Sequence, residues 1–271
     1  MVMDCLTIKR GDDGFGSQFF SIISGVIFCL KHNIPYSHRE IENIKLIDKD
    51  INQNEEVILA NKLINDVIKN LNVDSCKLNC KEKPFCHDII YDVGAGFYYT
   101  DEILDRFKKS YLIEKPEIYK NDKINIAIHI RRGDDIPFNN NSVYGDSWQK
   151  NLEERWIKSE VYDEIITKLL SIYPDSLIHI LSWGDPKLNV VDERIIYHIV
   201  NSGEKFIDDF NLLITSDILV VGSSTFSISA GFLNPNKVIC GDEICKLPRT
   251  PIPPQWIKNY NEILNDGNSF S

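Results

Sequence analysis

Hydrophobic residues recur along this chain with two different spacings, and segments of one spacing alternate with segments of the other. Short apolar runs rich in isoleucine and valine indicate buried strands. Between them, apolar residues three and four positions apart indicate amphipathic helices. The expected strands are 5–9, 34–37, 89–93, 124–130, 177–181, 194–200, 218–221 and 238–240; the expected helices are 17–30, 60–71, 101–112, 159–171, 205–216, one ending at 233, and 256–264.

Strands that alternate with helices are typical of parallel sheets, so the pattern predicts an α/β protein. The alternation is interrupted near the middle of the chain by Pro116 and the polar residues 119–123. We therefore expect two Rossmann-like domains, residues 1–120 and residues 121–271, the second of which ends in a terminal helix.

Composition and charge narrow the class of function. Of the 271 residues, 43% are hydrophobic and 26% are charged, which is typical of a soluble globular protein and compatible with a folded enzyme. The net charge of −10 argues against nucleic acid or an anionic membrane as a partner, because both favour a basic surface. A small anionic ligand in a local basic pocket is compatible with this charge.

The uncharged run 14–30 approaches the length of a membrane span. It contains three serines and Gln18, and two aspartates precede it, whereas a signal peptide begins with basic residues. We predict that the run is a helix buried within the protein. The expected location is cytoplasmic and soluble, without stable membrane insertion.

The metal-binding residue types do not form a convincing cluster. The seven cysteines stand at positions 5, 29, 76, 80, 86, 240 and 245. The set near position 80 lacks a Cys-x-x-Cys pair, so reduced thiols are expected in place of a zinc site. Asp48-Lys49-Asp50 matches a metal-binding Asp-x-Asp motif, but its polar surroundings favour a solvated loop.

Candidate chemistry begins where the apolar strand 124–130 ends, at Arg131-Arg132-Gly133-Asp134-Asp135. Ligands of open α/β sheets bind beyond the carboxyl ends of the strands. Guanidinium groups there are suited to bidentate contact with phosphate. The alternative is a pair of surface arginines that bridge the two aspartates and contribute little stability.

Two further segments place small residues before a buried helix. Glycines 11, 14 and 16 allow a tight turn before the helix 17–30. Residues 222–227 follow the strand 218–221. They consist of one glycine and a run of hydroxyl residues around Phe226. Free N–H groups at helix starts bind phosphate, although serine and threonine there serve equally well as ordinary caps.

Together these segments resemble the superfamily of α1,2- and α1,6-fucosyltransferases and protein O-fucosyltransferases. The stretch His129-Ile130-Arg131-Arg132-Gly133-Asp134 resembles its His-x-Arg-Arg-Gly-Asp signature. Gly14-Phe15-Gly16-Ser17-Gln18 is similar to the family's opening glycine loop, with Ser17 where the family has asparagine. Ser224-Thr225-Phe226 resembles the third signature, which contacts the nucleotide diphosphate.

The resemblance implies a GT-B glycosyltransferase with two Rossmann-like domains facing a central cleft. It implies an inverting, metal-independent transfer of fucose from GDP-fucose to a sugar hydroxyl of a glycan acceptor, without a resident cofactor. Arg131 would contact the β-phosphate, and Asp209 the guanine. The implied donor-binding residues are His129, Arg131, Arg132, Asp209, Ser223, Ser224, Thr225, Phe226, Gly14 and Gly16, and the candidate catalytic residues are Arg131, Asp134, Asp135 and Asp13.

Several points stay open in the sequence. The general base is any of the three candidate aspartates, since a carboxylate beside the acceptor hydroxyl can take its proton. The same fold could use another nucleotide-sugar donor. A non-catalytic relative that binds a sugar or nucleotide is a further alternative, which Ser17 supports because the family's asparagine is absent.

Overall fold

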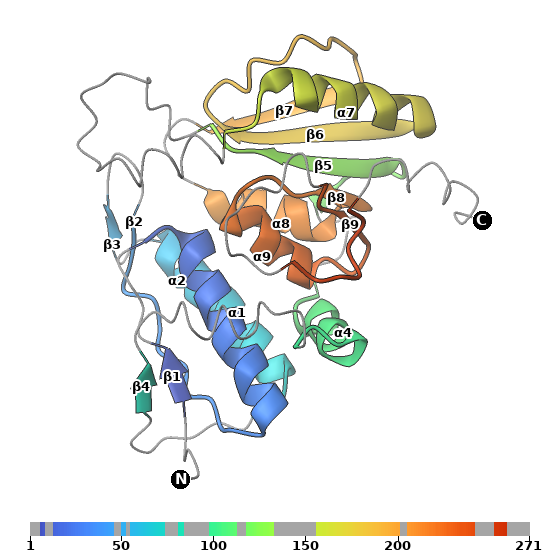
Figure 1. Ribbon diagram of the computed structural model, residues 1–271. Coiled ribbons are helices and arrows are strands. Elements are labelled where there is room, and N and C mark those ends of the chain that lie inside the picture. Colours follow the sequence, from blue (N-terminus) through green and yellow to red (C-terminus); the bar gives the residue numbers. More distant parts are fainter. Residues whose placement is uncertain are drawn as a thin grey trace.

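The computed structural model describes residues 6–8, 13–45, 50–52, 55–73, 81–83, 98–112, 118–132, 156–200, 205–241 and 252–258. Figure 1 labels its elements in chain order. They are β1 (Leu6–Ile8), α1 (Phe15–His32), β2 (Asn43–Lys45), β3 (Asp50–Asn52), α2 (Glu55–Asn70), β4 (Lys81–Lys83), α4 (Asp101–Ser110), β5 (Ile124–Ile130), α7 (Ser159–Ile172), β6 (Ser176–Trp183), β7 (Ile195–Val200), α8 (Phe206–Thr215), β8 (Ile218–Val220), α9 (Thr225–Leu233) and β9 (Lys237–Ile239).

The second half is built on a five-stranded sheet with the strand order β7-β6-β5-β8-β9. Every neighbouring pair is parallel, which confirms the α/β prediction for this half. The central strand β5 has the predicted bounds: its four isoleucines favour an extended backbone, and the strand is buried along most of its length. In Figure 1, α7 covers one face of the sheet, and α8 and α9 cover the other.

The described strands of the first half form two small sheets. β1 pairs with β4 in parallel, and β2 pairs with β3 antiparallel. The helix α1 is buried around most of its circumference, which confirms the interpretation of the uncharged run 14–30. Within the described part of the chain, no helix has both the length and the apolar character that crossing a membrane requires.

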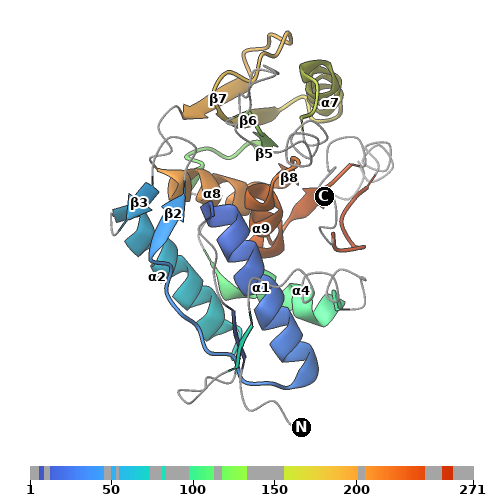
Figure 2. The same ribbon diagram turned by 60° about the vertical axis from the view of Figure 1, so that its left-hand side comes forward.

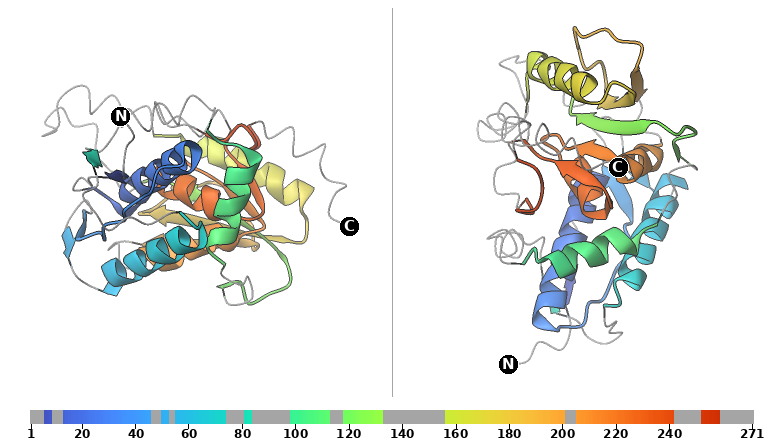
Figure 3. Two further views of the ribbon diagram at one scale, coloured as in Figure 1. Left: turned by 90° about the horizontal axis from the view of Figure 1, so that it is seen from below. Right: turned by 90° about the vertical axis from the view of Figure 1, so that its right-hand side faces the viewer.

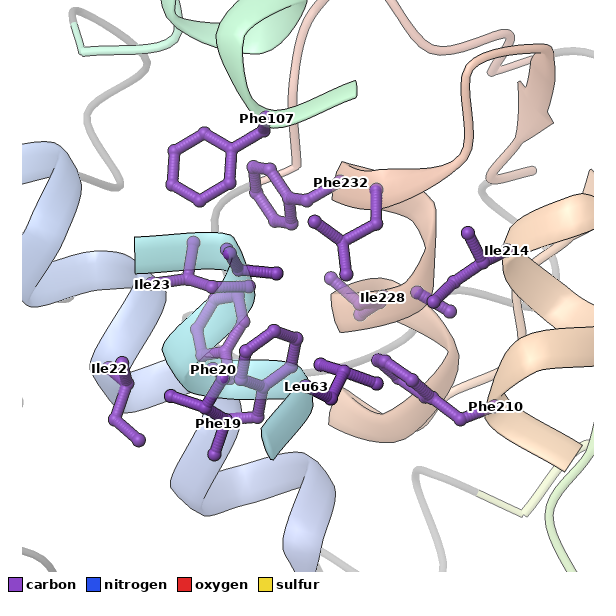
Figure 4. Packing of buried hydrophobic residues seen from close by; sticks show 14 of the residues in the cluster. Phe19, Phe20, Ile22, Ile23, Leu63, Phe107, Phe210, Ile214, Ile228 and Phe232 are labelled. Atoms are coloured by element: carbon purple, nitrogen blue, oxygen red, sulfur yellow. The ribbon is translucent and has the colours of Figure 1, made fainter. Parts of the chain in front are cut away.

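One hydrophobic core joins the first half to α8 and α9. Figure 2 and the right-hand view of Figure 3 show α1, α2 and α4 on one side of α8 and α9, with the sheet on the other side. Aromatic rings from both halves interdigitate in this core, as Figure 4 shows. Phe19 lies 5.6 Å from Phe210, and Phe107 lies 6.1 Å from Phe232, measured between ring centroids. The division at residue 120 and the GT-B layout stay predictions.

Two expected elements differ from the structure. The predicted strand 34–37 is reduced to a single bridge between Tyr36 and Leu6, because Pro35 has no N–H to donate to a ladder. The predicted helix 256–264 is wrong where it is described. Ile257 instead forms a parallel bridge with Ile239, and its N–H donates to the carbonyl of Val238. Residues 259–264 lie outside the described residues, as does the predicted strand 89–93.

Two cysteines, Cys29 and Cys240, lie within the described residues, and both are buried. The set near position 80, for which reduced thiols are expected, lies outside them. Burial raises the pKa of the Cys29 thiol to about 12, so it stays protonated near neutral pH. The five other cysteines lie outside the described residues. No group of three metal-ligating side chains occurs within the described ranges.

Candidate active site

The carboxyl end of β5 presents different residues to its two sides. Ile126, Ile128 and Ile130 pack on the side of α7, whereas Ala127 packs in the core shared with α8 and α9. Side chains alternate along a strand, so His129 lies on the same side as Ala127. Its ring centroid lies 5.5 Å from that of Phe226 in the first turn of α9.

His129 is a neutral residue held against α9. Its Nδ1 lies 3.2 Å from the hydroxyl oxygen of Ser227. Burial, together with the positive charge of Arg131, lowers the pKa of His129 to about 3. The imidazole is therefore uncharged near neutral pH and is a poor general base, but it can still donate or accept one hydrogen bond.

Arg132 lies on the opposite side, against α7, and its side chain is buried. Its guanidinium carbon lies 4.6 Å from the ring centroid of Trp156 and 5.6 Å from that of Tyr162, both cation–π distances. It donates to the hydroxyl of Ser159 and to the carbonyl oxygen of Arg131, which is 3.0 Å away. The structure thus separates the two predicted arginines and gives Arg132 contacts that fix the backbone of Arg131.

Ser159 is the first residue of α7, and a serine there could serve as its cap. The residue at the cap position is instead Lys158, which makes no side-chain capping bond. The hydroxyl of Ser159 donates to the carbonyl oxygen of Pro186, 2.9 Å away, and it accepts the bond from Arg132. This serine therefore links the end of β5 to the loop that follows β6.

The turn between β8 and α9 lies directly against β5. A side-chain carbon on Gly222 would lie 2.4 Å from the carbonyl oxygen of His129, so the turn requires glycine here. Ser223 is buried, and Ser224 caps α9, because its hydroxyl accepts a hydrogen bond from the N–H of Phe226. The structure thus brings together His129 and the predicted residues at the start of α9.

The first turn of α1 meets the first turn of α9, although 208 residues separate Ser17 from Thr225. The hydroxyl oxygens of these two residues are 3.4 Å apart. A side-chain carbon on Gly16 would lie 2.5 Å from the backbone nitrogen of Phe226. The contact is therefore a close approach of two backbones, which explains why the predicted loop has glycine at position 16.

These two helix starts also differ from others in charge. The first turns of α1 and α9 contain no acidic residue, and Gly14 at the cap position of α1 makes no side-chain capping bond. In contrast, α2, α4, α7 and α8 each carry at least one acidic residue in the first turn. Two partially positive helix ends in contact repel each other, and a bound anion would relieve this repulsion.

Aromatic rings hold the starts of three helices together. The ring of Phe15, the first residue of α1, lies 5.1 Å from the rings of Phe206 and Phe210 in α8 and 6.3 Å from that of Phe226 in α9. Phe210 and Phe226 are themselves 5.2 Å apart. This packing fixes the position of the α1 start relative to α9.

Asp209 lies in the first turn of α8, next to Phe210 in sequence. Burial raises its pKa to about 7, and the neighbouring carboxylates Asp208 and Glu56 add to this effect. Glu56 also accepts a hydrogen bond from the N–H of Ile207 and so links α2 to the start of α8. The proposed guanine contact of Asp209 remains a prediction.

Of the candidate bases, only Asp13 lies within the described residues. It is exposed, and its carboxylate accepts the N–H of Gly14 at 2.7 Å. The amide nitrogen of buried Gln18 donates to the carbonyl oxygens of Asp13 and Asn43, which holds this loop in place. Asp134 and Asp135 lie outside the described residues, so the choice of base stays open.

The sequence did not single out Ser227 or the pairing of Ser17 with Thr225. Ser227 contacts His129, and it stands three positions after the cap Ser224. In the sequence it looks like an ordinary helical serine. The hydroxyl run that contains it is the available signal, but its bond to another strand appears only in three dimensions.

Comparison with known proteins does not assign the chain to a family. No protein-family model and no curated protein sequence matches it. Among solved structures, it is similar to NodZ alpha-1,6-fucosyltransferase soaked with GDP-fucose, at 13% identity and a TM-score of 0.39, over 88% of this chain and 94% of that one. Fucosyltransferase NodZ from Bradyrhizobium gives 13% identity and a TM-score of 0.40, over 88% and 96%. These values are too low to support a functional argument.

Proposed function

We propose that this chain is a glycosyltransferase that binds a nucleoside-diphosphate sugar where the starts of α1 and α9 meet the end of β5. One observation carries the proposal: two helices whose first turns contain no acidic residue contact each other at their starts, on the side of the sheet that carries His129. Arg131 directly follows the last residue of β5. Such a place attracts a diphosphate, because helix N-termini and guanidinium groups both stabilise negative charge.

We further propose that the donor is GDP-fucose and that the acceptor is a sugar hydroxyl of a glycan. This choice rests on the three sequence signatures, which resemble those of fucosyltransferases. In the reaction, Arg131 and the two helix starts would stabilise the charge that develops on the leaving diphosphate, a role that needs no metal. Asp13, Asp134 or Asp135 would take the proton of the acceptor hydroxyl as it attacks from the opposite face, which inverts the anomeric configuration.

A thermal-shift panel with GDP, UDP, ADP and their sugars tests the donor. GDP and GDP-fucose should raise the melting temperature most, because a ligand that binds the folded state stabilises it. Equal stabilisation by UDP would contradict the assignment of guanine as the base but would still support a diphosphate site. No stabilisation by any of these nucleotides would contradict the proposal as a whole.

One observation favours a second candidate, a binding protein without transferase activity. Ser17 stands where the fucosyltransferase superfamily has asparagine, and its hydroxyl oxygen lies 3.4 Å from that of Thr225. Slow hydrolysis of GDP-fucose in the absence of acceptor separates the two. An enzyme releases GDP and free fucose, whereas a binding protein leaves the donor intact at saturating occupancy.

A further inference from the structure

Ser227 is completely buried in α9 and connects three parts of the candidate site. Its hydroxyl oxygen accepts a hydrogen bond from the N–H of Gly222, 3.1 Å away. It lies 3.2 Å from Nδ1 of His129, 3.3 Å from the carbonyl oxygen of Ser224 and 3.5 Å from that of Gly222. The hydroxyl has one proton and three possible acceptors for it.

The backbone hydrogen bonds favour Nδ1 of His129 over the two carbonyl oxygens as acceptor. The carbonyl of Ser224 already accepts the N–H of Ile228 at 3.1 Å, and the carbonyl of Gly222 accepts the N–H of Ser224 at 2.7 Å. Nδ1 of His129 is also the nearest of the three acceptors. A buried, unprotonated ring nitrogen without a donor would cost free energy, so the serine proton is best placed on this bond.

The charge state of His129 fits this arrangement. Burial and Arg131 keep its pKa at about 3, so the ring carries one proton near neutral pH. Arg131 is the charge that acts on it from its own strand, and α9 carries no charged residue between Thr225 and Leu233. At the start of α8, Asp208 acts on Asp209 and on Glu56, and Glu56 also acts on Asp209.

We propose that Ser227 is a positioning residue whose hydroxyl donates to Nδ1 of His129 and so fixes the neutral tautomer with its proton on Nε2. His129 then offers an N–H donor to an anionic ligand without adding charge to a place that already contains Arg131 and two helix N-termini. The inference deepens the proposed function and rests on it for the identity of the anion. The assignment of the tautomer rests on the contacts of Ser227 and not on the identity of the anion.

Long-range ¹H–¹⁵N NMR of the full chain at pH 7 reads the tautomer directly, and a His129→Gln variant identifies the signal among those of the six histidines. The wild type should carry the proton on Nε2. Ser227→Ala should populate the Nδ1–H form, because that nitrogen has lost its donor. GDP affinity should fall by about tenfold or more, since a hydrogen bond to a charged group is weakened.

Ser24→Ala is the matched control. Ser24 is a buried helical serine whose hydroxyl donates to the carbonyl of Phe20 at 2.9 Å within α1. This variant should keep both the wild-type tautomer and the wild-type GDP affinity. A proton on Nδ1 in the wild type would overturn the inference, even if Ser227→Ala does not fold. It would also be overturned if Ser227→Ala matched Ser24→Ala in tautomer and GDP affinity. If the wild type has the Nε2–H tautomer but does not bind GDP, the proposed function fails and the positioning role of Ser227 stands.

Discussion

Asp209 lies in the first turn of α8 beside Asp208 and near Glu56, in a position where burial opposes ionisation. Its pKa rises from 3.8 to about 7 on folding. The folded state therefore holds the proton more tightly between about pH 4 and pH 7. The protonated carboxyl therefore stabilises the folded state fully below about pH 4, and this stabilisation is lost as the pH rises through 7.

Asp209→Asn should therefore stabilise the protein at high pH more than at low pH. The variant cannot ionise, so at pH 8 it should gain roughly 1–2 kcal/mol over the wild type, with little difference at pH 4. Thermal melts at the two pH values measure this. Asp105→Asn, on the exposed side of α4, controls for the loss of a carboxylate. A gain for Asp209→Asn that does not change with pH would refute the role of burial.

The two arginines after β5 show how far single residues can be predicted. Their charge at the end of an apolar strand indicated an anion site, and both were expected to serve it. The period of two along a strand sends neighbouring side chains to opposite sides, and Arg132 finds Trp156 and Tyr162 there. Trp156 stands 24 positions further along the chain, beyond the reach of a local pattern.

At the scale of elements, the contact between the starts of α1 and α9 allows a sharp test with Gly16→Ala. The new side-chain carbon would lie 2.5 Å from the nitrogen and 2.6 Å from the α-carbon of Phe226. Backbone atoms cannot rotate away, so the two helix starts must separate. We expect a loss of about 1–3 kcal/mol in stability and at least a tenfold loss of GDP affinity by titration calorimetry.

Gly25→Ala is the control for this prediction, because it crowds the same helix elsewhere. Its new carbon would lie 2.5 Å from Cγ1 of Ile8, a side-chain atom in β1. This variant should lose stability but keep its affinity for GDP. Equal affinity losses in Gly16→Ala and Gly25→Ala would mean that general destabilisation, and not the contact between α1 and α9, sets GDP binding.

Elements with a strong periodic pattern were predicted well, and short polar ones were not. The strand β5 was predicted with its full bounds, because seven residues with four isoleucines admit few alternatives. The strands β2, β3 and β4 have three residues each and contain mainly polar side chains, so no local signal marks them. The expected terminal helix failed at Ile257, where pairing with β9 prevails over helical spacing.

At the scale of the whole molecule, the shared core explains how distant segments meet in one site. The apolar face of α1 packs against α8 and α9, and this packing carries the glycine loop to the start of α9. The sequence predicted the described helices α1, α2, α4, α7, α8 and α9 from their spacing of apolar residues. It could not predict that helices from both expected domains share one core, because hydrophobic periodicity gives the buried face of a helix but not its partner.

A charge-based mechanism predicts how the whole protein responds to chelation. Arg131 and the two helix starts supply the positive charge, so hydrolysis of GDP-fucose should continue in excess EDTA at an unchanged rate. Release of GDP over time measures this. Loss of activity in EDTA that Mn²⁺ or Mg²⁺ restores would contradict the mechanism and assign the charge to a metal.

Calorimetric titration of Arg131→Ala with GDP and with guanosine tests whether β5, α1 and α9 converge on a diphosphate. The substitution should weaken GDP binding by tenfold or more, because a charge-assisted contact is lost. Guanosine, which has no phosphate, should bind the variant as it binds the wild type. Arg131→Lys should recover part of the loss, since it keeps the charge but not the bidentate geometry. A correctly folded Arg131→Ala variant with unchanged GDP affinity would show that β5, α1 and α9 do not converge on a diphosphate.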